Sequence, residues 1–270
     1  MARIESAFYD IGTMDGLSNQ DTSVHRLDPR AKVLTTLVFI VMVVSFEKHE
    51  VSALIPFFIY PFVLIALGNL PAIYFLKKIL LVAPFAFLIA IFNPIIDREI
   101  LIHVGPLGIS GGWVSFTSIM IRFILTVGAA LLLIALTGFN AVCMALEKMG
   151  SPRIFAIQLL FVYRYLFVLI EEASRVVRAR SLRSFRGRGL GIRVFGSMVG
   201  QLLLRTLDRA QRIHTAMLCR GFDGEIRIKR PLRIGGKEVG FILGWSALFV
   251  VMRAVNIPPL LGEFVRRLVQ

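Results

Sequence analysis

The sequence predicts an all-α integral membrane protein with a bundle of about five or six transmembrane helices and two further long amphipathic helices. Hydrophobic residues make up 56% of its 270 residues, whereas a globular domain is about 45–50% apolar by a broader count. These residues gather in runs of roughly the 20-residue length that crosses a bilayer. The net charge of +14 lies in a different part of the chain. This separation excludes intrinsic disorder, which combines charge with low hydrophobicity.

Five apolar runs are the candidate membrane spans. They lie at residues 31–46, 51–67, 79–96, 116–137 and 239–257. The second run contains Pro56 and Pro61, which membrane helices tolerate because neighbouring groups can satisfy the freed backbone carbonyls. Charged residues separate the runs, so each is predicted to form its own helix.

A sixth apolar stretch, residues 154–170, allows two interpretations. It contains Arg164 and continues without a helix breaker into a charged segment. It therefore either crosses the bilayer or forms the membrane-buried half of a long helix that emerges into the cytoplasm. Ser151 and Pro152 have the residue types of an N-cap and a first helical position. They predict a helix that continues to about Arg183.

Residues 172–238 hold most of the excess charge, with 16 Lys and Arg against 5 Asp and Glu. Segments rich in Lys and Arg stay on the cytoplasmic side of a membrane, so this segment is predicted to be cytoplasmic in a multi-pass protein of the cell membrane. The predicted order is an N-terminal cytoplasmic segment, 1–30; helices 1–4, 31–137; a cytoplasmic region partly buried in the membrane, 138–238; and a final helix and tail, 239–270. The number of crossings and the side of the C-terminus stay open.

The basic segment is predicted to fold into a second amphipathic helix. Its apolar residues recur at helical spacing, at Val199, Leu203, Thr206, Ala210, Ile213 and Met217. Three arginines, Arg205, Arg209 and Arg212, fall on another stripe. Glycines at 187, 189 and 191 predict a flexible elbow between the two long helices.

The sequence gives no sign of a catalytic, metal or cofactor site. The four histidines are scattered, without the ligand spacing of a zinc site. Cys143 and Cys219 lack a neighbouring base that would activate a thiolate. Few aromatics accompany the arginines, which disfavours nucleic acid and leaves anionic membrane lipids as a candidate partner. We therefore predict that the chain is not an enzyme.

Two arginines interrupt apolar runs, Arg122 in the fourth and Arg164 in the sixth. A charge inside a membrane segment is costly, so such residues are candidates for a functional role in the bundle interior or a polar cavity. Both side chains could equally extend along the helix to place their charge at the membrane interface.

A short repeat ends both long helices. Ala179, Arg180 and Ser181 end the first, and Cys219, Arg220 and Gly221 end the second, with the two arginines 40 positions apart. A cation at a helix C-terminus is favoured by the helix dipole, and a guanidinium binds a carboxylate with two parallel hydrogen bonds. The repeat therefore predicts docking onto acidic grooves of a partner, or ordinary helix capping.

Three segments carry a resemblance to a known family. They are HRLDPRAK at residues 25–32, the paired arginine motifs, and RGFDG at residues 220–224. With them the chain resembles the transmembrane (T) component of energy-coupling factor (ECF) transporters, most closely the CbiQ type of cobalt and nickel uptake. Ser181 departs from the family's usual glycine and Cys219 from its alanine, but both are small.

The resemblance implies a coupling role without catalysis. It implies that the long helices cross in the cytoplasm, and that Arg180 and Arg220 dock on two ATP-binding-cassette (ABC) subunits, which would bind the ATP. A separate substrate-binding membrane subunit of the CbiM/CbiN kind would hold the metal. The alternatives are a vitamin as substrate, a permease that binds substrate itself, and a membrane protein whose basic segment binds lipid headgroups.

Overall fold

The computed structural model describes residues 13–47, 50–96, 100–104, 107–183, 191–223 and 235–254. These residues form two compact units. One contains residues 15–145 and 235–254, and the other contains residues 146–183 and 191–223. The predicted glycines 187 and 189, Gly224 of the last motif and the tail 255–270 lie outside the described residues.

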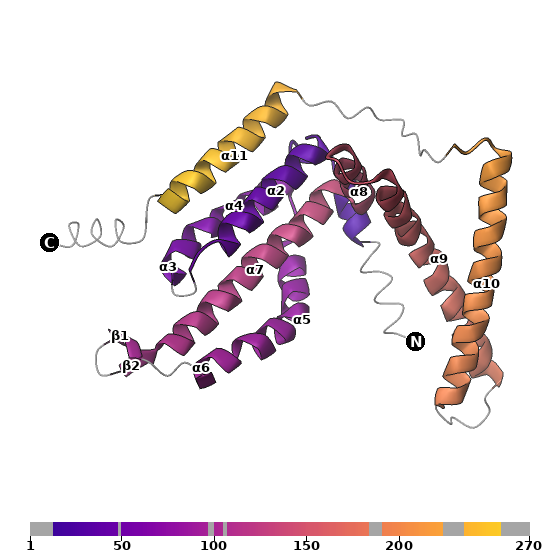
Figure 1. Cartoon of the computed structure of the whole chain (residues 1–270), viewed down its shortest axis with the longest axis horizontal. Coiled ribbons are helices and arrows are strands. Elements are labelled where there is room, and N and C mark those ends of the chain that lie inside the picture. Colours follow the sequence, from indigo (N-terminus) through magenta and orange to yellow (C-terminus); the bar gives the residue numbers. More distant parts are fainter. Residues whose placement is uncertain are drawn as a thin grey trace. The chain divides into compact units, whose positions relative to one another are not determined.

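The elements of the larger unit are almost all helices, which confirms the all-α prediction (Figure 1). They are α2 (Pro29–Val44), α3 (Val51–Leu54), the 3-10 helix η1 (Ile55–Phe58), α4 (Ile59–Gly68), α5 (Ala72–Ala90), α6 (Phe92–Ile96), α7 (Gly111–Thr137) and α11 (Gly236–Ala254). Helix α8 (Phe139–Lys148) contains the boundary between the units.

One short hairpin was not predicted. Strands β1 (Ile100–Val104) and β2 (Leu107–Ser110) pair antiparallel just before α7. The β-branched residues of β1, Ile100, Ile102 and Val104, favour an extended backbone. The stretch is too short for a helical period, and it carries too few residues to change the fold class.

Helix α7 is the central element of the larger unit. It packs against α2, α4, α5 and α6, and its buried stripe includes Leu125, Ala129 and Leu132. Helix α4 approaches α7 closely at Gly68, where an added Cβ atom would lie 2.7 Å from Leu136 Cδ2. Only glycine fits at that position without a shift of its neighbour.

An aromatic cluster holds α11 against α2. The ring of Phe39 lies 4.6 Å from that of Tyr60 and 5.3 Å from that of Phe249, measured between centroids. All three side chains are buried, and the Tyr60 hydroxyl forms a 3.0 Å hydrogen bond with Thr36 Oγ1. The cluster joins residues more than 180 positions apart, so it fixes the last described helix in the core of this unit.

Four described segments are long and apolar enough to cross a membrane. They are Val51–Gly68, Ala72–Pro94, Gly111–Thr137 and Arg153–Arg183. Of the other predicted runs, α2 has only 16 residues, and α11 carries Lys237, Glu238 and Arg253. The helix predicted from residue 79 begins at Ala72 instead, so Lys77 and Lys78 lie within it.

Candidate functional site: the α9–α10 helix pair

The smaller unit consists mainly of two long helices, α9 (Arg153–Arg183) and α10 (Ile192–Cys219). Helix α9 begins at Arg153, one residue later than the predicted first position Pro152, and ends at Arg183 as the sequence predicts. Helix α10 begins after Gly191, which is its N-cap residue. Figure 1 shows α10 alongside α9, and the two helices pack against each other.

Glu172 of α9 connects the two helices. Its Oε1 accepts a 2.5 Å hydrogen bond from Arg205 Nη1, and its Oε2 lies 4.0 Å from Arg209 Nη2. Only 13% of the Glu172 side chain is exposed. Arg205 and Arg209 are four residues apart and therefore share a face of α10. One carboxylate thus meets two arginines on successive turns.

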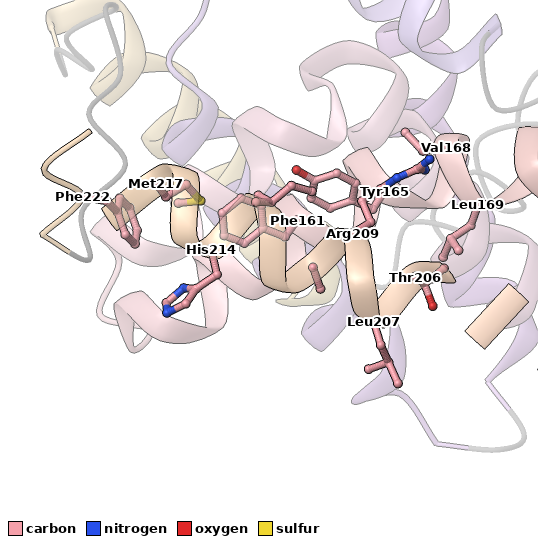
Figure 2. Close-up of a pocket in the computed structure, with 12 residues that line it drawn as sticks. Phe161, Tyr165, Val168, Leu169, Thr206, Leu207, Arg209, His214, Met217 and Phe222 are labelled. Atoms are coloured by element: carbon pink, nitrogen blue, oxygen red, sulfur yellow. The ribbon is translucent and has the colours of Figure 1, made fainter. Parts of the chain in front are cut away.

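The contacts show that α9 and α10 run antiparallel. Glu172, late in α9, meets Arg205 and Arg209, whereas Phe161, a few turns earlier, lines one pocket together with Met217, late in α10. Figure 2 shows this order, with Phe161 near Met217 at one end and Leu169 near Thr206 at the other. The C-termini of the two helices therefore point in opposite directions.

The contact face of α10 is rotated from the predicted stripe. Thr206, Ile213 and Met217 are half-buried as predicted, but Val199 and Leu203 are 47% and 58% exposed, and Ala210 is exposed as well. Met198, Leu202 and Arg209 are half-buried in their place. Hydrophobic periodicity missed this rotation because the ion pairs with Glu172 bring Arg209 onto the contact face.

Arg220 ends α10 in a Schellman motif. The Gly221 N–H donates to the Leu218 carbonyl and the Phe222 N–H donates to the Met217 carbonyl, both at 3.0 Å. These bonds satisfy carbonyls that a helix end leaves unpaired. Gly221 has φ +74°, a conformation that costs other residues roughly 1–2 kcal/mol. The motif therefore explains the Arg-Gly-Phe order: it fixes where α10 stops and leaves Arg220 at its tip.

Arg180 lies differently, because α9 continues for three residues beyond it. The Ser181 hydroxyl donates to the Arg178 carbonyl at 2.8 Å, and Ala179 and Arg180 are exposed. At the other end Cys219, Arg220 and Gly221 are exposed as well. Within the described residues, neither motif guanidinium has a hydrogen bond or an ion pair.

The two motif arginines lie far apart. Arg180 is eight residues beyond Glu172, or about 12 Å along α9 at 1.5 Å per residue. Arg220 lies about 20 Å along α10, in the opposite direction, from the turn that holds Arg205 and Arg209. At this helical rise the two arginines are thus separated by about 30 Å along the helix axes, at opposite ends of the helix pair.

Arg122 of α7 has a structural partner. Its Nη2 donates to the Glu47 carbonyl, in the turn that follows α2. Arg253 of α11 donates to the neighbouring Ser45 carbonyl at 3.1 Å and lies over the Phe46 ring. Two arginines therefore bind carbonyls at the C-terminal end of α2, where the helix dipole favours cations.

Arg164 is exposed on α9, in the apolar half of that helix. Neither Arg122 nor Arg164 lines the α9–α10 pocket or the apolar groove between α4, α5 and α7. The cavity that a substrate-binding permease would place around these two residues is therefore not found at either location.

The HRLDPRAK segment forms a junction that sequence reasoning did not foresee. Asp28 caps α2 by accepting a 2.9 Å hydrogen bond from the Arg30 N–H. The buried Lys32 Nζ donates to the Leu136 carbonyl at 2.8 Å and to the His25 carbonyl at 3.3 Å. Lys32 thus joins the start of α2 to the end of α7. A lysine in the first turn of a helix that is uncharged after it was the available signal.

His25 lies in the same junction. Its Nδ1 is 2.7 Å from Thr22 Oγ1 and its Nε2 is 3.0 Å from the Leu17 carbonyl. Burial, followed by the nearby Lys32 ammonium, lowers the pKa of His25 below its usual value. His25 therefore tethers the segment before α2 through both of its ring nitrogens.

The part of the chain that the structure describes contains no cluster of three or more His, Cys, Asp or Glu side chains that could hold a metal ion. Cys143 is buried and Cys219 is exposed, and both are free thiols. The geometry instead defines a helical membrane protein with a basic, antiparallel helix pair.

Comparison with known proteins gives the family. The profile of the CbiQ family, described as "Cobalt transport protein", matches residues 20–231. The chain belongs to this family, which confirms the resemblance found in its motifs. The family is a membrane component of a transporter and not an enzyme, and the chain shares that character.

Two named relatives agree with this assignment, and an uncharacterized protein is also similar to the chain. The energy-coupling factor transporter transmembrane protein EcfT of Heliobacterium modesticaldum is 29% identical over 253 residues, covering 86% of this chain and 92% of the relative. The cobalt transport protein CbiQ of Salmonella typhimurium is 29% identical over 131 residues, covering 47% and 58%. An uncharacterized protein of Methanocaldococcus jannaschii is 27% identical over 230 residues, covering 82% and 78%.

Proposed function

We propose that the chain is the transmembrane coupling subunit of an ECF-type ABC importer. In this role α9 and α10 are the coupling helices, and Arg180 and Arg220 each dock on one of two ABC-type ATPase subunits. The supporting observation is the antiparallel contact of the two helices, which places the motif arginines at opposite ends of the pair. Two subunits can engage such ends at the same time.

The chemistry of the motifs suits docking. Arg180 and Arg220 are exposed and lie beside small residues, Ala179 and Ser181 at one end and Cys219 and Gly221 at the other. Small neighbours let a partner's surface come close, and the planar guanidinium can bind a carboxylate bidentately. Such a charge-assisted contact contributes about 1.5–3 kcal/mol, enough to affect assembly when it is lost.

Helix α9 offers a direct mechanical connection. It is one continuous helix of 31 residues, or about 46 Å at 1.5 Å per residue, and its first half is apolar enough for the membrane. Movement imposed at Arg180 would therefore be carried along the helix, and Glu172 would pass it to α10. A separate CbiM/CbiN-like membrane subunit, which holds the substrate, would receive the motion.

The same role orients the chain in the membrane. The basic segment 172–238 would lie in the cytoplasm, where the ATPases are, and its arginines would also meet anionic lipid headgroups. ATP would bind to the partner subunits and no cofactor to this chain. As substrate we propose the cobalt ion, on the names of the CbiQ family and of its Salmonella member; nickel and a vitamin are the alternatives.

Affinity purification of the tagged chain, co-expressed with its partners, tests the coupling role. The wild-type chain should co-purify with ATPase subunits and a small membrane protein. The variants Arg180→Lys and Arg220→Lys keep the charge but lose the planar fork, and together they should lose most of the ATPase. Matched controls are Arg175→Lys and Arg212→Lys, exposed arginines on the same two helices.

The lysine variants separate the proposal from its rival. If the basic segment only binds lipid headgroups, lysine serves as well as arginine, and all variants behave like the wild type. Full ATPase recovery with the Arg180→Lys/Arg220→Lys double variant would therefore count against docking through these residues. Uptake of labelled cobalt, nickel and vitamins by the reconstituted complex would identify the substrate.

A further inference from the structure

The α9–α10 interface contains a pocket of about 450 Å³, within the range of about 300–1,000 Å³ that small-molecule sites occupy. Its walls are mainly apolar and aromatic, from Phe161, Tyr165 and Leu169 on α9 and Ile213 and Met217 on α10. Phe222 forms one end, held there by the Schellman motif that fixes its backbone. Figure 2 shows these side chains around the pocket.

The pocket also has a polar side with one cation. Arg209 and His214 line it, Arg209 supplies the positive charge, and none of its described lining residues is acidic. Arg209 lies 4.0 Å from Glu172 Oε2, whereas Arg205 holds the other oxygen at 2.5 Å. Arg209 thus contributes the weaker of the two ion pairs, and a planar guanidinium has five N–H donors. It can accept a further anion at the pocket's edge.

We propose that this pocket binds a long-chain fatty acid, with the hydrocarbon chain against the aromatic walls and the carboxylate on Arg209. The charge of the lining selects an anion, and a carboxylate matches the two-pronged geometry of a guanidinium. Size favours a single chain over a protein helix. A helix is about 10–12 Å across and rises about 5.4 Å per turn, so the pocket would hold only about one turn of it.

Binding would also act on the contact between the helices. The ligand's carboxylate competes with Glu172 for Arg209. In the bound state Glu172 therefore keeps its ion pair with Arg205 and loses the one with Arg209. An effect of the ligand on coupling to the ATPases would rest on the proposed function. Binding of the fatty acid in the pocket does not rest on it. The test below therefore measures binding alone.

The experiment is photo-crosslinking of the full-length chain in phospholipid nanodiscs. The probe is palmitic acid with a diazirine near the middle of its chain, and labelled peptides are located by mass spectrometry. We expect labelling of α9 and α10 at the pocket residues, and at least a fivefold reduction by excess unlabelled palmitate. A matched diazirine probe ending in an alcohol should label these residues at least fivefold less.

Two variants address the two halves of the site. Arg209→Gln removes the anion contact, and Ala210→Leu fills the pocket, which Ala210 lines, without touching the charges. Each should lower the competed labelling at least fivefold. Arg212→Gln is the matched control, because Arg212 is exposed on the same helix and does not line the pocket.

Three results would overturn the proposal. Labelling that excess palmitate does not reduce would mean bulk lipid contact only. Equal labelling by the alcohol probe would mean that Arg209 selects nothing. Unchanged labelling in Ala210→Leu, with the protein still monodisperse, would show that the hydrocarbon chain of the probe binds outside the pocket.

Discussion

Single residues at helix ends fix where the elements of this chain begin and stop. Asp28 caps the start of α2, Lys32 binds the last turn of α7, and Gly221 ends α10 in a left-handed conformation. Each of them belongs to a motif that carried the family resemblance. The motifs thus have a structural purpose in this chain in addition to any contact with partners.

Gly221→Ala should destabilise the C-terminal end of α10 by roughly 1–2 kcal/mol, because alanine at φ +74° is strained. Gly200→Ala is the matched control: Gly200 lies inside α10 with no atom within 4 Å of an added Cβ, so alanine there should stabilise the helix by roughly 0.5–1 kcal/mol. Thermal unfolding of both variants, followed by circular dichroism, measures the difference. Equal shifts in the same direction would contradict the Schellman assignment.

The depressed pKa of His25 predicts a pH dependence. Burial lowers the pKa of this imidazole in the folded chain, so the unfolded chain binds the proton more readily. Stability from this residue is complete above the unfolded pKa of about 6.5 and is lost as the pH falls through the folded value. The melting temperature should drop between pH 7 and pH 5 more in the wild type than in His25→Gln, and parallel curves would refute the idea.

At the scale of whole elements, hydrophobic periodicity predicts most of the helices but not the contact between α9 and α10. The start and end of α9 follow from Pro152 and from the lack of a breaker before Arg183. The rotation of α10 depends on Glu172, 33 residues from Arg205, and such a distant ion pair leaves no periodic signal. The β1–β2 hairpin was missed for a different reason. Strand β1 is too short for a helical period, and its apolar residues do not alternate with polar ones.

Glu172 is predicted to hold the helix pair in a defined geometry. Spin labels on Cys219 and on Ser181→Cys should report a distance of about 30 Å, estimated from the helical rise. Glu172→Gln leaves Arg205 and Arg209 without their shared anion, so the distance distribution should broaden. Glu171→Gln is the control, because Glu171 pairs with Arg175 of its own helix. Unchanged distributions in Glu172→Gln would show that apolar packing alone sets the geometry.

At the scale of the whole molecule, the sequence distinguishes a membrane part from a candidate cytoplasmic part, but it does not give the membrane topology. Apolar content identifies a membrane protein and the charge of residues 172–238 identifies its cytoplasmic candidate. Helices α2 and α11 are too short or too charged to be assigned as spans by composition, although both belong to the same aromatic core. Packing inside a bundle lets such helices depart from the pattern, so counting crossings needs a topological experiment.

The native cysteines test one part of this topology, the side of the membrane on which the basic segment lies. Cys219 is exposed beside Arg220, whereas Cys143 is buried, so a membrane-impermeant maleimide should label one site per chain. If the basic segment is cytoplasmic, the chain expressed without partners should be labelled in inside-out vesicles and not in right-side-out vesicles. Cys219→Ser should abolish the signal and Cys143→Ser should leave it unchanged. Labelling of intact right-side-out vesicles from the outside would show that the topology is the opposite of the one proposed. Arg180 and Arg220 would then lie outside the cell, where no cytoplasmic ATPase could bind them.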